Sequence, residues 1–415
     1  MPIDIVEINV VTQAAALPKE SFTELAIAGH KGTGDTNVLK TFYSASEVSA
    51  EHGTGSDLYR AAAKAFAQGV KQAFFVNAEE TAVVDEAPVD GVLLHKPLNG
   101  DVLPAITVAA VAKTVVWVND SPIGTVPTGE VHVNPKTGEV KAGDAGAILV
   151  DYTYVDWTSA LAVLEPEKPD ILILSDTRVD KGDVGDMDAL LTWSSANMCV
   201  LAFALKNAAT QAEADAIRAQ LASKYGYAVA HQSPDDVGAA IGAIMATVRP
   251  WFTMMWREVQ AIATTFYPKG QVGKEGAGST FEGSSVNVLV SLAGNTRTSN
   301  GLSTAGAGSN YRYVDVTRTE AMAVQLIEDE LVSLRLRAGK IPFTPSGILA
   351  VKTAVETVLQ GMTDDGALAS YVVTVPDIGQ VSSSDKANRL LKPITVTAVL
   401  AGEIQSFSVD LFITI

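Results

Sequence analysis

The sequence predicts a multidomain protein of the α/β and α+β classes. We expect an interrupted α/β core with an inserted all-β module, a C-terminal α+β domain and extended terminal β arms. Three observations lead to this prediction. The chain has 415 residues, more than one hydrophobic core usually organises, and 47% of them are hydrophobic. Strands alternate with helices in two stretches that a strand-rich segment separates. Both chain ends have the pattern of β-strands.

The two predicted arms cover residues 1–20 and 402–415. In the C-terminal arm, apolar side chains fall on every second position, at Phe407, Val409, Leu411, Ile413 and Ile415. The β-prone N-terminal arm has its apolar side chains at Ile3, Ile5, Ile8 and Val10. Chain ends usually fray unless something holds them. The two strands therefore either complete the sheets of their own subunit or are donated to neighbouring subunits, and donation would make the protein a building block.

The α/β core is predicted from residues 21–85 together with 157–265. The expected strands are 24–28, 72–76, 171–174, 198–204 and 227–231, and the expected helices are 56–68, 187–196, 210–225 and 235–248. Ser56 is a suitable N-cap, and Thr210 with Glu213 has the spacing of a capping box. Alternating strands and helices imply a largely parallel sheet with right-handed crossovers.

Residues 86–156 are predicted to form the inserted β-rich module. Strand-like runs alternate there with turn clusters, at 91–95, 105–110, 114–118, 130–133 and 147–154. The segment Asn134–Glu139 between two strands indicates a hairpin. We expect this module on the outer surface, because tolerated insertions concentrate at exposed loops.

Residues 280–401 are predicted to form the C-terminal α+β domain. Its first long helix is expected to start at the capping box Thr317–Glu320 and to stop at Gly339. The densest basic cluster of the chain, at the end of this helix, consists of Arg335, Arg337 and Lys340. Basic residues are favoured at a helix C-terminus in any case. A second helix starts at Thr344 and runs to about residue 361, and a strand at 394–399 follows.

Composition excludes several classes of function. The chain has 30 basic and 47 acidic residues, a net charge of −17, which argues against nucleic acid as a partner and predicts salt-sensitive assembly. The single cysteine, Cys199, excludes an internal disulfide and lies in an apolar run typical of a buried thiol. No apolar run is long enough to insert into a membrane. The N-terminus lacks a signal-peptide pattern, so we expect a soluble protein made in a cytoplasm.

No catalytic, cofactor or metal site is predicted. The loop Gly29–Gly34 lacks the Lys-Ser/Thr ending of a phosphate-binding loop. The five histidines share no ligand spacing, at His30, His52, His95, His132 and His231. An acidic loop follows the strand 171–174, with carboxylates at Asp176, Asp180, Asp183, Asp186 and Asp188. Ligands of open α/β sheets bind at such strand ends, so a metal-dependent α/β enzyme that uses this loop is an alternative hypothesis. Trp251 and Trp256 are interpreted as part of an apolar helix.

Several segments resemble the sheath proteins of contractile phage-like tails. In the N-terminal part they are a strand ending in Gly29, the Lys31–Gly32 turn, Val48–Gly53, the helical Ser56–Gly69 and Ala73–Val76. In the C-terminal part they are Gly294–Thr298, Tyr311–Thr319, the helix 345–361, Asp364–Leu368 and Pro393–Val409. The resemblance covers most of the chain, although the inserted module is similar only in kind.

This resemblance implies a non-enzymatic structural protein of a virion tail, assembled in the host cytoplasm. It implies hexameric rings that stack helically around a tail tube and contract to drive the tube through a target envelope. The implied partners are further copies of the chain, the tail tube protein, and the baseplate and tail-terminator proteins. The arms would add strands to sheets of neighbouring subunits, and Arg335, Arg337 and Lys340 would face an acidic tube. A phage, a bacteriocin-like particle and another injection system fit equally well. A different tube or surface-layer subunit is the remaining alternative.

Overall fold

The computed structural model describes residues 24–30, 32–97, 104–118, 121–175, 184–205, 210–273 and 280–402. The chain divides into two compact units. The larger unit contains Thr23–Arg249 and Trp256–Val314, and the smaller unit contains Pro250–Met255 and the residues from Asp315 onward. The prediction of a mixed α/β and α+β architecture is confirmed, while the domain boundaries stay predictions.

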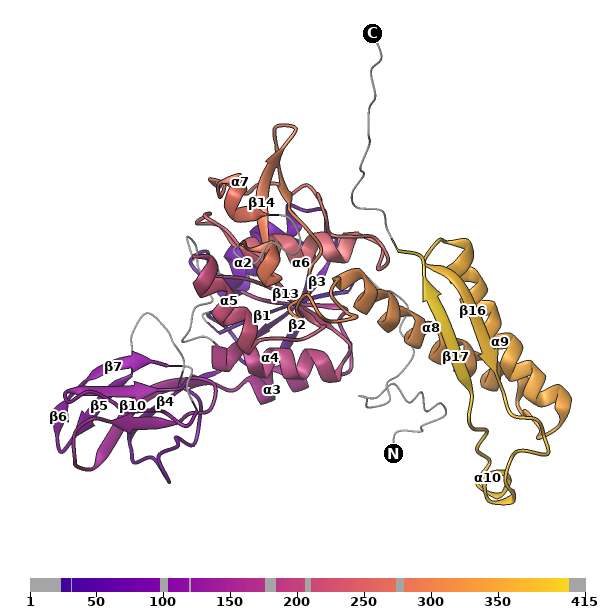
Figure 1. The fold of residues 1–415 in the computed structure, drawn as a ribbon, viewed down its shortest axis with the longest axis horizontal. Helices are drawn as coiled ribbons and strands as arrows, with labels where there is room; N and C mark the ends of the chain where they lie inside the picture. Colours follow the sequence, from indigo (N-terminus) through magenta and orange to yellow (C-terminus); the bar gives the residue numbers. More distant parts are fainter. Residues whose placement is uncertain are drawn as a thin grey trace, which may run out of the picture. The chain divides into compact units, whose positions relative to one another are not determined.

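An eight-stranded sheet forms the centre of the larger unit, in the order β15-β14-β13-β12-β11-β1-β3-β2 (Figure 1). Its strands are β1 (Leu25–Gly29), β2 (Leu39–Phe42), β3 (Ala73–Asn77), β11 (Ile171–Leu174), β12 (Val200–Ala204), β13 (Gly226–Ala230), β14 (Asn287–Leu292) and β15 (Asn295–Thr298). The six inner strands run parallel, and β2 and β15 pair antiparallel at the two edges. The strands β1, β3, β11, β12 and β13 are buried along their whole length, as expected for a parallel sheet covered on both faces. The predicted parallel core is therefore confirmed.

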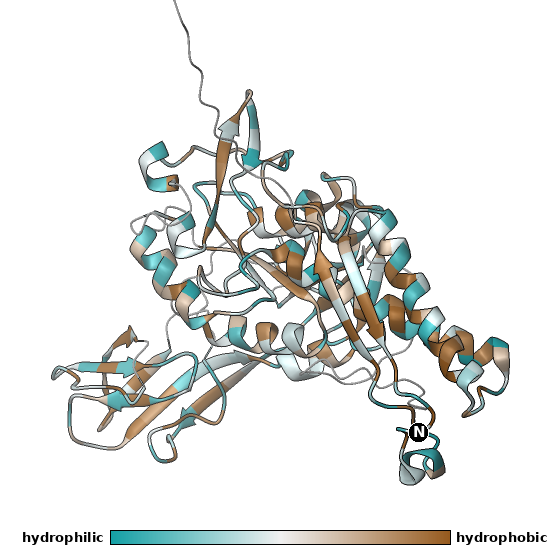
Figure 2. Ribbon diagram, turned by 45° about the vertical axis from the view of Figure 1, so that its right-hand side comes forward, coloured by the Kyte–Doolittle hydropathy of each residue, from teal (hydrophilic) through white to brown (hydrophobic). Residues whose placement is uncertain are grey.

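Several described helices of the larger unit start at a residue whose side chain accepts an N–H of the first turn, and the full set of described helices follows. They are α1 (Ala45–His52), α2 (Asp57–Phe66), α3 (Trp157–Ala162), α4 (Val184–Ala196), α5 (Gln211–Gln220), α6 (Val237–Thr247), α7 (Lys269–Val272) and the short 3-10 helix η1 (Glu282–Ser284). The Ser56 cap and the complete Thr210–Glu213 capping box are confirmed. Helix α6 lies very close to the sheet, because a Cβ added at Gly242 would be 2.5 Å from Ile173 Cγ1. Central strands are mainly apolar, and the helices mix apolar and hydrophilic residues (Figure 2).

The inserted module follows β3 and returns to the core at α3. Its strands are β4 (Glu80–Glu86), β5 (Ala105–Val108), β6 (Val111–Ala112), β7 (Thr114–Trp117), β8 (Glu130–Val133), β9 (Val140–Ala142) and β10 (Ile148–Val155). They form two sheets, β4-β10-β5-β6 and β7-β8-β9. One apolar cluster joins both sheets, and it includes Ile106, Val131, Val133 and Val150. The predicted hairpin at Asn134–Glu139 is confirmed as the β8–β9 connection. The strand predicted at 91–95 is wrong, because only isolated bridges involve Val92 there.

The smaller unit packs two long helices on a two-stranded sheet. Its elements are α8 (Val314–Ala338), α9 (Pro345–Asp364), β16 (Leu368–Thr374), α10 (Ser383–Ala387) and β17 (Thr395–Leu400). The core of this unit is a buried cluster that includes Met322, Val355, Leu359, Leu368 and Val373. The Thr344 N-cap and the proline after it are confirmed as the start of α9.

Two helix predictions are corrected. Helix α8 begins at Val314, so the supposed capping box at Thr317 lies inside the helix. No helix forms at 250–256, and Trp256 has a φ of 59° and is 48% exposed. The reason is that this segment joins β15: the Trp256 N–H donates to the Thr298 carbonyl and the Val259 N–H to the Thr296 carbonyl, both at 2.9 Å.

Candidate assembly surfaces

The predicted arm residues lie outside the described residues. This applies to Ile3, Ile5, Ile8 and Val10 of the N-terminal arm, and to Phe407, Val409, Leu411, Ile413 and Ile415 of the C-terminal arm. The described chain ends at Gly402, two residues after β17. The Ala401 N–H donates to the Ala367 carbonyl at 3.1 Å, which holds the end of the described chain beside the start of β16.

The β16–β17 sheet has two open edges within the part of the chain that the structure describes. The strands pair antiparallel with each other, from Leu368 opposite Leu400 to Thr374 opposite Thr395. Each strand therefore has one described partner, and its other edge presents backbone N–H and C=O groups. Such edges are templates for a strand from another chain. A two-stranded sheet is marginally stable alone, so the packing of α8 and α9 on one face is what holds this one.

The outward face of this sheet is apolar at two positions. Val372 is 63% exposed and Val399 is 53% exposed, although the inward-facing Val373 is buried. Val372 lies opposite Thr397, and Val399 lies opposite Ser370. Directly opposed residues share a face of the sheet, so the two valines are diagonal neighbours on the outward face. Strand β16 and these residues were not predicted from the sequence. Its signal is the β-prone run Tyr371–Val375 between Gly366 and Pro376.

A structured excursion connects β16 to β17 and carries the short helix α10. Ser382 caps this helix, with its Oγ accepting the Asp385 N–H at 3.0 Å. Hydrogen bonding from Ser382, together with the Lys392 ammonium 3.4 Å away, holds the pKa of Asp385 below its usual value. The carboxylate therefore stays charged at neutral pH and links the start of α10 to Lys392, shortly before β17.

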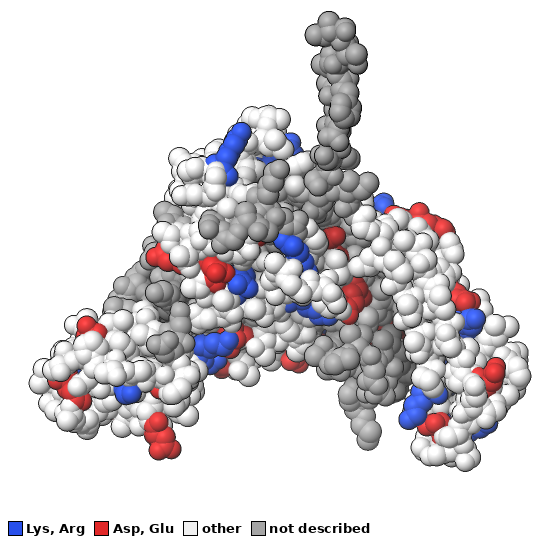
Figure 3. Space-filling model, viewed as in Figure 1, with Lys and Arg blue, Asp and Glu red and all other residues white. Residues whose placement is uncertain are grey.

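The predicted tube-facing residues lie together at the end of α8. Arg335 and Arg337 are in its last turn, Lys340 follows, and all three are exposed. The Arg335 guanidinium donates to the Gly339 carbonyl, and Arg337 Nη2 lies 2.6 Å from Glu330 Oε1. One arginine thus caps its own helix, as expected from the helix dipole. On the molecular face in Figure 3, basic and acidic residues are interspersed.

Two exposed leucines that were not predicted from the sequence accompany this basic cluster. Leu336 is 72% exposed at the end of α8, and Leu349 is 58% exposed in the first turns of α9. The two helices are joined by residues 339–344, so both leucines lie at the same end of the helical hairpin. Apolar side chains rimmed by charge are typical of protein–protein contacts. Their exposure depends on the tertiary packing, so it could not be predicted from the helical spacing of apolar residues in the sequence.

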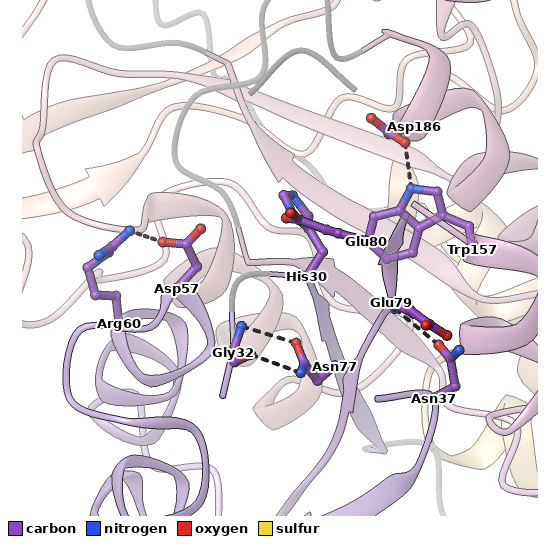
Figure 4. A network of polar contacts seen from close by, with 10 residues as sticks. All are labelled: His30, Gly32, Asn37, Asp57, Arg60, Asn77, Glu79, Glu80, Trp157 and Asp186. Carbon is purple, nitrogen blue, oxygen red and sulfur yellow. Dashed lines mark hydrogen bonds and ion pairs between the residues drawn. The ribbon is translucent and has the colours of Figure 1, made fainter. Parts of the chain in front are cut away.

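The acidic loop of the alternative enzyme hypothesis is only partly described. Asp176, Asp180 and Asp183 lie outside the described residues. Asp186 accepts a hydrogen bond from Trp157 Nε1 at 2.6 Å, and Asp188 lies 3.2 Å from Lys136 Nζ and 3.6 Å from Lys96 Nζ. Figure 4 shows the indole of Trp157 pointing at the Asp186 carboxylate. Asp186 and Asp188 therefore bind side chains from the module and its exit rather than converging on each other.

Polar groups at the carboxyl ends of β1 and β3 bind one another (Figure 4). Asn77 Oδ1 accepts the Gly32 N–H and Asn77 Nδ2 donates to the Gly32 carbonyl, both at 3.1 Å. His30 Nδ1 lies 2.5 Å from Glu80 Oε1. The Gly29–Gly34 loop is thus fastened by Asn77, which agrees with a structural turn. Cys199 is buried, as predicted.

Within the described ranges, no group of three or more His, Cys, Asp or Glu side chains could hold a metal ion. In the same ranges, no helix is long and apolar enough to cross a membrane.

Comparison with known proteins shows which proteins share this fold. No family model matches the sequence. No curated protein matches it either. Solved structures do match, at 10–12% identity. A chain of the six-fold symmetrised anti-feeding prophage baseplate aligns with a TM-score of 0.59 and 12% identity, covering 100% of this chain and 98% of that chain. A chain of the contracted helical sheath of the anti-feeding prophage aligns with a TM-score of 0.56, 12% identity and the same coverage.

A third similar structure is a crystal structure of the sheath tail protein from Desulfitobacterium hafniense. Its TM-score is 0.51 at 10% identity, and the alignment covers 95% of this chain and 100% of that chain. The fold of this chain is therefore the fold of contractile tail sheath proteins. The likeness extends over almost the full length of both chains, including both compact units. The resemblance inferred from the sequence motifs is confirmed for the fold.

Proposed function

We propose that this protein is the structural subunit of a contractile tail sheath, with no enzymatic activity. It polymerises as stacked hexameric rings around a tail tube and contracts to drive the tube through a target cell envelope. The observation that carries this proposal is the full-length likeness to chains of the anti-feeding prophage baseplate and contracted sheath. The six-fold symmetry of that baseplate supports rings of six.

Strand exchange links the subunits in this proposal. The arms 1–20 and 402–415 leave their own subunit and pair with the outer edges of β16 and β17 in neighbours. The open edges of that sheet support the idea, since an added strand gains main-chain hydrogen bonds and covers Val372 and Val399. Each subunit donates and accepts at different surfaces, so the contact is heterologous and propagates into a polymer.

The tail tube is the second partner. The basic cluster Arg335, Arg337 and Lys340 faces an acidic tube, and Leu336 and Leu349 supply apolar area at the same end of the helical hairpin. The baseplate and a tail terminator bind the two ends of the sheath, and the inserted module lies on the outer surface. The assembled protein resides in a virion tail and is built in the host cytoplasm.

Negative-stain electron microscopy of the purified protein, across salt and protein concentration and with its tube protein added, tests this proposal. Wide hollow tubes with cross-striations are expected. Because the net charge is −17, tube formation is expected to increase with salt that screens repulsion between subunits. Closed oligomers or monomers under all these conditions, with the tube protein present, would contradict the proposal.

A further inference from the structure

The hairpin between β8 and β9 reaches from the inserted module back to the α/β core. Asn134 shapes this hairpin: its Oδ1 accepts the N–H groups of Lys136 at 2.9 Å and Thr137 at 3.1 Å. Asn134 is 2% exposed and Pro135 is also buried, even though they form a connection between two strands. A turn at the tip of a module is ordinarily exposed, so its burial indicates a docking contact.

The first turn of α4 receives the hairpin. A Cβ added at Gly185 would lie 2.1 Å from the Pro135 carbonyl oxygen and 3.6 Å from Lys96 Cδ. Gly185 is buried and its backbone is helical. Since glycine is unfavourable inside a helix, its use here is explained by the close approach of the Pro135 backbone.

Charged groups surround this close contact. Lys136 Nζ lies 3.2 Å from Asp188 Oδ1 and donates to the Gln220 carbonyl at 3.0 Å. Lys96, from another loop of the module, lies 3.6 Å from the other oxygen of Asp188. These side chains are partly exposed, so each ion pair is modest, but Lys136 makes both an ion pair and a hydrogen bond to the core and so adds to the packing of Pro135 on Gly185.

Side-chain and backbone interactions also hold the two chain segments that connect the module to the core. At the entry, Glu80 binds His30 of the core at 2.5 Å. At the exit, Trp157 donates to Asp186 of α4 at 2.6 Å. The Asp156 N–H donates to the Glu79 carbonyl at 3.1 Å, which joins entry and exit to each other. Helix α4 thus receives both the exit and the hairpin.

We propose that the inserted module and the α/β core form one rigid body. The contact that holds them together is the docking of the Asn134–Glu139 hairpin against Gly185 and Asp188. A module held only by its two connections would swing about them, and the hairpin contact removes that freedom. The module keeps its orientation when neighbouring subunits rearrange. This property belongs to the single subunit and is independent of assembly.

Distance measurements between spin labels test the proposal on the full chain. Cys199 is buried and can remain, so labels go on cysteines introduced at exposed Lys71 of the core and exposed Val111 of the module. A second pair of labels, at Lys71 and exposed Ala212, lies within the core. It shows how broad the distance distribution is for two labels on one rigid body. We expect the Lys71–Val111 distance distribution to be single and as narrow as the core pair. A distribution several times broader would overturn the proposal.

Substitution of Gly185 gives a test whose expected effect is opposite to the one that helix propensity alone predicts. Gly185→Ala favours the helix by propensity but places a methyl group against Pro135, so it is expected to broaden the Lys71–Val111 distribution and leave the core pair unchanged. Gly361→Ala in α9 is the matched control, since nothing lies within 4 Å of an added Cβ there. Equal, unchanged distributions in both variants would overturn the proposal.

A milder variant covers the case in which Gly185→Ala does not fold. Lys136→Met is expected to speed hydrogen exchange of the amides in 134–139 and in the first turn of α4. Lys113→Met, which removes a lysine paired with Asp144 at 2.9 Å within the module, is the matched control and is expected to leave both segments unchanged. The same exchange rates in these segments for both variants would contradict a docked hairpin.

Discussion

Val372 in β16 and Val399 in β17 are diagonal neighbours on the outward face of a two-stranded sheet, and both are more than half exposed. On the opposite face, Val373 is buried against the helices. Among the described residues this sheet has two unpaired edges and two exposed valines on its outward face, which is an unusual surface for a protein that stays monomeric. The proposed arm exchange would cover it.

Removal of the C-terminal arm is expected to separate folding from assembly. Deleting Glu403–Ile415 leaves the described core clusters intact, so the variant should give the far-UV circular dichroism and melting temperature of the full chain. It should form no tubes, because the strand donor is missing. Tubes from the truncated protein would refute arm exchange, and an insoluble product would show that the strand belongs to its own subunit.

A charge on the outward face is expected to block the same contact. Val399→Lys should change the free energy of unfolding by less than about 0.5 kcal/mol, because the side chain is 53% exposed. Polymerisation followed by light scattering should fall strongly, since charged residues on edge strands oppose strand addition. Val84→Lys, at a 70% exposed valine in β4, is the matched control and should polymerise normally. Equal polymerisation of both variants would argue against β17 as an acceptor.

Neutralising the basic cluster is expected to weaken the tube contact. Arg337→Gln breaks only the partly exposed pair with Glu330, so the free energy of unfolding should change by about 0–1 kcal/mol. Co-sedimentation with tube protein should decrease, and more so for the Arg335→Gln, Arg337→Gln double variant. Lys352→Gln in α9 removes the same charge and should have no effect. If all three variants sedimented alike, the cluster would not face the tube.

Stability is expected to fall in acid partly through Asp235. Burial alone would raise the pKa of this carboxyl, but hydrogen bonds from Lys64 Nζ at 2.7 Å and the Ala263 N–H at 2.9 Å hold it below its usual value. The folded-state pKa is thus depressed, so the contribution is present above the unfolded-state pKa of about 3.9 and is lost as pH falls through the lower folded-state value.

Asp235→Asn tests that contribution. At pH 7 the variant should lose about 1–2 kcal/mol of unfolding free energy, and the gap to the unmutated protein should close below pH 4. Asp215→Asn, at a more exposed carboxylate paired with Arg218, should lose less than about 0.5 kcal/mol. Urea titrations at several pH values measure both differences. A constant gap from pH 7 into acid would exclude the linkage.

Much of the fold could be predicted from the sequence, and the failures have identifiable causes. The strands around Ile173 and Phe203 are apolar along their length, and helix caps such as Ser56 and Thr210 act locally. The buried strands and these helix starts could therefore be predicted from the sequence. Strand β16 was missed because a register shift after Leu368 disturbs its alternation. A helix at Trp251 and Trp256 was predicted wrongly, because pairing with β15 depends on residues far along the chain.

Some of the candidate assembly residues could likewise be predicted from the sequence, and others could not. Arg335 and Arg337 follow from a local rule on helix ends, and the structure places them together. Val372, Val399, Leu336 and Leu349 were not predicted, since exposure of an apolar side chain is decided by tertiary packing. The docking of Lys136 on Asp188 likewise joins segments whose proximity no local pattern encodes.

The most direct test of strand exchange is a cryo-electron microscopy structure of tubes formed by this protein. We expect the β16–β17 sheet of each subunit to gain a strand at each outer edge, one from residues 3–10 and one from residues 407–415 of other subunits. The contradicting result would be tubes in which β16–β17 stays two-stranded, or in which both terminal segments pair within their own subunit.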